Sequence, residues 1–145
     1  MVKKWVAVLT GVTLSLGLLL LQDSASAQNT KGKTRAAATK YLMRGINQPN
    51  CAGLGTLLKD SGPTDDKAWE TAVCQASILN EMGYLLMDDE RCPDGAWAAA
   101  AKDLREGSAL VLVALEKKDV DGAKVAFKTV TGACAACHKA HRPQK

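Results

Sequence analysis

Residues 123–141 read AKVAFKTVTGACAACHKAH, and this stretch decides the fold. Apolar and cysteine positions recur in it every three or four residues, which is the spacing of one face of an α-helix. That face carries Ala123, Phe127, Val130, Cys134, Cys137 and His141. We therefore expect a long amphipathic helix, started by Asp119, that buries this side against the rest of the chain.

Three more helical stretches precede it, over residues 35–59, 64–87 and 94–118. Thr64 and Asp94 are expected to cap the second and third helices, because their side chains can accept hydrogen bonds from free amides. Pro49 predicts a kink or break in the first helix, since proline removes a backbone donor and crowds the preceding turn. Short connections between amphipathic helices predict an all-α, antiparallel up-down-up-down four-helix bundle.

The amino terminus resembles a secretory leader. Lys3 and Lys4 precede a weakly polar to apolar run over residues 6–21, and Ala25-Ser26-Ala27 offers small residues for cleavage. A membrane anchor would need about 20 apolar residues and no cleavage site. We therefore expect residues 1–27 to be a cleaved signal peptide, and residues 28–145 to form a single periplasmic domain without stable membrane insertion.

The five residues Cys134-Ala135-Ala136-Cys137-His138 match the attachment signature of a c-type haem. Thiols three positions apart lie about one helical turn from each other, so both can add to the vinyl groups of one porphyrin. The imidazole that follows is a good iron ligand. The motif therefore predicts one covalent haem c, with Cys134 and Cys137 as thioethers and His138 as the proximal ligand.

A second axial ligand has to approach from the opposite face of the porphyrin. His141 follows His138 by three residues on the same helix, so it is excluded. Met43, Met82 and Met87 are the remaining soft side chains at the correct end of the bundle. Met43 has the best claim because its helix is expected to lie beside the last one, although each methionine also suits simple core filling.

The other three cysteines, Cys51, Cys74 and Cys92, allow at most one internal disulfide and leave one thiol over. A different interpretation makes Cys134, Cys137 and either His138 or His141 a zinc site or a redox dithiol. Zinc normally takes four ligands, however, and a thioredoxin-like motif follows a strand.

Charge and motifs also limit the function. The formal net charge of +4 is too small an excess to indicate a nucleic-acid partner. Acidic residues fall at helix ends and turns, where capping explains them. With no catalytic base, nucleophile or phosphate-binding loop standing out, we do not predict an enzyme.

A haem motif at the carboxyl end of a helical bundle of this size resembles the class II cytochromes c. These include the cytochrome c prime family and its methionine-ligated low-spin relatives. The resemblance covers residues 35–143, and residues 134–142 look like the family's closing helix, with a basic residue, Arg142, four after the proximal histidine. The resemblance implies that Met43 is the distal ligand, and that a homodimer could form through the first two helices.

Two functions follow as hypotheses. The first is a periplasmic electron carrier with iron held by His138 and Met43, which docks redox partner proteins near Lys128, Lys139 and Arg142. The second is a module that binds a diatomic gas, nitric oxide or carbon monoxide, at an open or displaceable distal position. The role of Met43 separates them.

Overall fold

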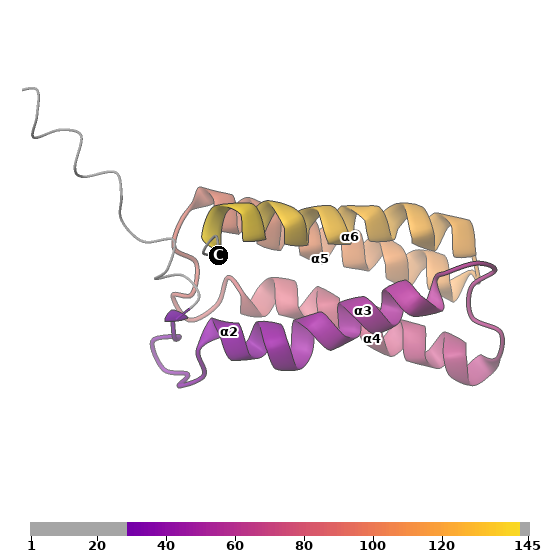
Figure 1. Ribbon diagram of the computed structural model, residues 1–145, viewed down its shortest axis with the longest axis horizontal. Coiled ribbons are helices and arrows are strands. Elements are labelled where there is room, and N and C mark those ends of the chain that lie inside the picture. Colours follow the sequence, from indigo (N-terminus) through magenta and orange to yellow (C-terminus); the bar gives the residue numbers. More distant parts are fainter. Residues whose placement is uncertain (1–28, 143–145) are drawn as a thin grey trace, which may run out of the picture.

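The computed structural model describes residues 29–142, which fold into helices packed side by side (Figure 1). The first helical segment has three consecutive parts, α2 (Thr39–Leu42), the π-helix η1 (Met43–Asn47) and α3 (Gln48–Leu57). The other helices are α4 (Asp66–Leu85), α5 (Gly95–Glu116) and α6 (Val120–His141). The prediction of an all-α fold is therefore confirmed, with four helical segments packed together.

Aspartate side chains start the last three helices. Asp94 accepts a hydrogen bond from the Trp97 amide at 2.8 Å, and Asp119 accepts one from the Gly122 amide at 2.8 Å, as predicted. The prediction for α4 is wrong by one residue, because Asp65 is the cap and accepts from the Ala68 amide at 2.8 Å. A carboxylate serves this position well because it also complements the positive end of the helix dipole.

The core draws on all four helical segments. Leu54, Leu79, Val111 and Val130 have no exposed surface, and they come from α3, α4, α5 and α6 respectively. Packing is most extensive between α5 and α6, then between α4 and α5, and then between α3 and α4. Gly107 lets α5 approach α6 closely, since a Cβ there would lie 3.1 Å from the Val130 nitrogen.

The first helical segment differs from its prediction in two ways. It begins at Thr39 and not near Arg35. It also continues through Pro49 without a break, because the chain widens into η1 just before the proline. The Asn50 side chain donates a hydrogen bond to the Ile46 carbonyl at 2.7 Å, which gives this carbonyl of the irregular turn a side-chain partner. The wider turn replaces the expected kink.

The predicted signal peptide, residues 1–27, lies outside the described residues. Within residues 29–142, no helix has the length and apolar character needed to cross a membrane.

Candidate functional site

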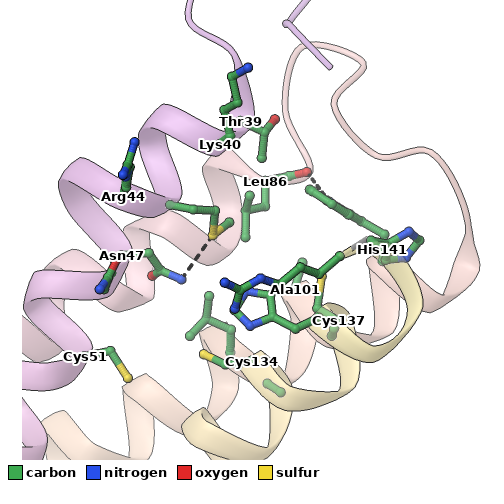
Figure 2. A pocket seen from close by; sticks show the side chains of 18 of the residues that line it. Thr39, Lys40, Arg44, Asn47, Cys51, Leu86, Ala101, Cys134, Cys137 and His141 are labelled. Atoms are coloured by element: carbon green, nitrogen blue, oxygen red, sulfur yellow. Dashed lines mark hydrogen bonds between the residues drawn. The ribbon is translucent and has the colours of Figure 1, made fainter. Parts of the chain in front are cut away.

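A pocket of about 910 Å³ opens between the first helical segment and α6 (Figure 2). Its volume lies within the range of about 300–1,000 Å³ that is common for small-molecule and cofactor sites. The residue after α4, Leu86, and the first turns of α5 close its far side. The pocket is thus lined by residues from the first helical segment, α5, α6 and the end of α4. The apolar lining consists of Leu86, Trp97, Ala100, Ala101, Leu104 and Ala133.

The motif over residues 134–138 forms the α6 side of this pocket, and Cys134, Cys137 and His138 all line it. Both thiols are half-buried. Burial, and then the negative charge of Asp94, raise the pKa of Cys137 to about 11. The pKa of Cys134 is also raised, first by its hydrogen bond with Cys51 and then by burial. Both motif cysteines are therefore protonated thiols at neutral pH.

Burial, and then the positive charge of Arg142, lower the pKa of His138 below its usual range. This favours the neutral imidazole, which is the form that binds metals. His141 also lines the pocket, but it is buried and packs edge-on against Trp97 with ring centroids 5.3 Å apart. Its Nε2 atom lies 3.4 Å from a carboxylate oxygen of Asp94. His141 therefore belongs to the packed end of the bundle.

The three candidate methionines occupy different surroundings. Met43 lies in η1, lines the pocket opposite α6, and its sulfur accepts a hydrogen bond from the Asn47 side chain at 3.5 Å. Met82 is only 2 % exposed, and together with Met87 it lines a separate groove between α4 and the first helical segment. Of the three, the structure places only Met43 in the pocket with the motif.

All five cysteines are free thiols, and the three outside the motif come from separate elements. Cys51 lies on α3 and lines the pocket opposite Cys134. Cys74 is exposed on α4, whereas Cys92 lies before α5 with its thiol 3.3 Å from the Asp94 carbonyl oxygen. The disulfide that the sequence allowed among these three is not formed.

Basic side chains surround the pocket from two helices. Arg142 lines it from the end of α6, but Lys128 and Lys139 do not. Sequence reasoning missed Lys40 and Arg44, which line the pocket from the first helical segment. The sequence does contain a signal for the face of the first helical segment that lines the pocket. Its residues recur at spacings of four, three and four, namely Lys40, Arg44, Asn47 and Cys51. The apolar periodicity does not reveal this face, because three of its four residues are polar or charged.

Within the described range, no group of three or more histidine, cysteine, aspartate or glutamate side chains is placed to hold a metal ion. No protein-family model matches the chain, and neither does a curated protein or a solved structure.

Proposed function

We propose that this chain is a periplasmic c-type cytochrome that transfers single electrons through one covalently attached haem. The observation that carries this proposal is the position of the motif. Cys134, Cys137 and His138 line a pocket of cofactor size whose opposite side presents the Met43 sulfur. The proposal includes the resemblance to the class II cytochromes c and an antiparallel up-down-up-down order. Short connections over residues 86–94 and 117–119 support that order.

The residues of the pocket fit a haem. Apolar side chains from α5 and α6 provide a dry surface, and the half-buried thiols lie where a porphyrin edge could be fixed. Lys40 and Arg44 add positive charge that suits haem carboxylates. Asn47 lines the pocket, and its buried Oδ1 atom has no hydrogen-bond partner, which leaves one unsatisfied acceptor beside the pocket.

When bound, haem supplies an iron that gains and loses one electron. The chain contributes the rest. Cys134 and Cys137 fix the position of the group, and His138 offers a neutral nitrogen ligand because its pKa is lowered. Asn47 orients the thioether of Met43. A histidine and a thioether together favour a raised reduction potential, which suits an electron carrier that meets redox partner proteins.

The irregular backbone around Met43 favours a second function, binding of nitric oxide or carbon monoxide. Met43 lies in a π-helix, a feature often found at functional sites, and it is only half-buried. A side chain on such a segment can leave the iron more easily than one on a regular, buried helix. The distal position would then be open or displaceable.

The test is the visible and near-infrared spectrum of the oxidised protein after expression with a c-type maturation system. We expect a low-spin, methionine-ligated spectrum that is lost in Met43→Leu and kept in the control Met82→Leu. Leucine replaces methionine at little steric cost in either position. A high-spin spectrum that Met43→Leu leaves unchanged would overturn methionine ligation and support gas binding. Protein without haem would contradict both functions and favour the zinc or dithiol alternative.

A further inference from the structure

Cys51 is a nucleophilic side chain in the pocket that the proposed electron carrier does not use. It belongs to α3, whereas Cys134 belongs to α6. Figure 2 shows the two side chains on opposite sides of the pocket with their sulfur ends pointing toward each other. Each thiol is the largest single influence on the pKa of the other. Cys74 and Cys92 do not line this pocket, so Cys51 is the one extra cysteine next to the motif.

The two thiols differ in their protonation. The hydrogen bond with Cys134 lowers the pKa of Cys51 to about 7, against the opposing effect of burial. The same contact raises the pKa of Cys134. Of the two thiols, Cys51 is therefore the one that loses its proton more readily. Since the thiolate is the form that attacks disulfides, Cys51 is the reactive member of the pair.

We propose that Cys51 is a redox-active partner of the attachment motif, and that in the haem-free chain it forms a disulfide with Cys134. The oxidant is a low-molecular-weight disulfide or an oxidised dithiol protein of the compartment to which the chain is exported. Such a bond would join α3 to α6 across the pocket. It would also occupy one of the thiols that haem attachment requires, and this consequence rests on the proposed function.

The reaction proceeds by two thiol–disulfide exchanges. The Cys51 thiolate attacks one sulfur of the oxidant, the oxidant's S–S bond breaks, and its second sulfur leaves as a thiolate that takes up a proton. The Cys134 sulfur then gives up its proton and attacks the Cys51 sulfur, which expels the remaining half of the oxidant as a thiol. Cys51 and Cys134 together lose two electrons and two protons, and the oxidant gains both.

The direct test uses the haem-free full chain incubated with oxidised glutathione. Remaining thiols are alkylated, and the protein is digested with trypsin without reduction. We expect a disulfide between the fragments 45–59 and 129–139, with Cys137 alkylated. The linked pair should disappear in Cys51→Ser and persist in Cys74→Ser. A bond between Cys134 and Cys137, a glutathione adduct on Cys51 alone, or complete alkylation would each overturn the proposal.

The pH dependence of alkylation gives a second measurement on the reduced protein. The rate at Cys51 should rise through about pH 7, and this rise should move to higher pH in Cys134→Ser because the hydrogen bond is lost. An unchanged profile in that variant would contradict the pairing of the two thiols.

Haem loading in a maturation system separates this proposal from the proposed function. Without added reductant, Cys51→Ser should carry more covalent haem than the unmodified chain, and Cys74→Ser should not. Equal loading would contradict the inhibitory role of Cys51. If the disulfide forms but no variant ever carries haem, the proposed function fails while the cysteine pair stands.

Discussion

The first helical segment and the last helix face each other across one pocket, yet they are built differently. Helix α6 is an unbroken α-helix of 22 residues, capped by Asp119 and packed along α5. The first segment divides into α2, η1 and α3 within a shorter span. The regular helix carries the motif, and the irregular segment carries Met43 and Cys51. In the proposed cytochrome, α6 would be the fixed side that holds the haem, and the first helical segment would be the adjustable side that supplies Met43.

Trp97 packs against the end of the fixed side. This residue is 3 % exposed, donates from Nε1 to the Leu86 carbonyl at 2.8 Å, and packs against His141. It therefore ties the end of α6 to the end of α4. We expect Trp97→Ala to lower the free energy of unfolding by about 3–5 kcal/mol, as measured by urea titration. Trp69→Ala, in a half-buried position, should cost less, and an equal loss would contradict the special role of Trp97.

The adjustable side is held at its start by Arg91. This side chain is 1 % exposed, and its Nη1 atom donates to the Ala37 carbonyl at 2.9 Å and the Thr39 hydroxyl at 3.4 Å. We expect Arg91→Ala to cost about 1–3 kcal/mol, because a part-buried carbonyl and a buried hydroxyl lose their donor.

Hydrogen exchange shows which helix the Arg91→Ala substitution destabilises. In Arg91→Ala, the amides of α2 should exchange faster while those of α6 keep their protection. Arg44→Ala, on the exposed face of η1, serves as the control and should have little effect on either helix. Equal loss of protection in α6 would show that the two sides are not independent.

Deleting Gly45 sharpens the comparison by making the first segment regular. A π-turn holds about one residue more than an α-turn for the same rotation, so removing Gly45 converts η1 to α-helix while the flanking residues keep their faces. Met43 should then stay in the pocket, and the haem spectrum should stay methionine-ligated, unlike that of Met43→Leu. Gly45→Ala keeps the π-turn, and a Cβ there would contact nothing within 4 Å. It should stabilise the protein by up to about 1 kcal/mol. Loss of the methionine-ligated spectrum after the deletion would contradict the assigned register.

The smallest expected effect is the pH dependence that His138 brings to the haem-free protein. Its folded pKa lies below the ordinary value of 6.5, so the unfolded chain binds the proton more readily. The contribution of His138 to stability is therefore complete above that value and is lost as pH falls below it. Urea midpoints should fall between about pH 7 and 5, and less steeply in His138→Gln. Identical slopes would contradict the lowered pKa.

The two facing sides also show what sequence patterns predict well. The regular apolar spacing in α6 correctly predicts the face that the helix buries. The Asp94 and Asp119 caps are also predictable, because the first amides of a helix have no partner within the helix and need an acceptor. The first segment is harder to predict from sequence, because a π-helix changes the spacing of residues on one face. A proline also does not indicate by itself whether a helix breaks or widens. The contact between Cys51 and Cys134 joins residues far apart in sequence, and no local pattern encodes it.

The central claim is that Cys134 and Cys137 hold one haem. Intact-mass and fragment analysis of the protein expressed with a c-type maturation system tests it most directly. We predict a single haem mass on fragment 129–139, with both cysteines resistant to alkylation and the adduct lost in the double variant Cys134→Ser, Cys137→Ser. An unmodified fragment with two alkylated cysteines, from cells that load haem onto a control cytochrome, would contradict the claim.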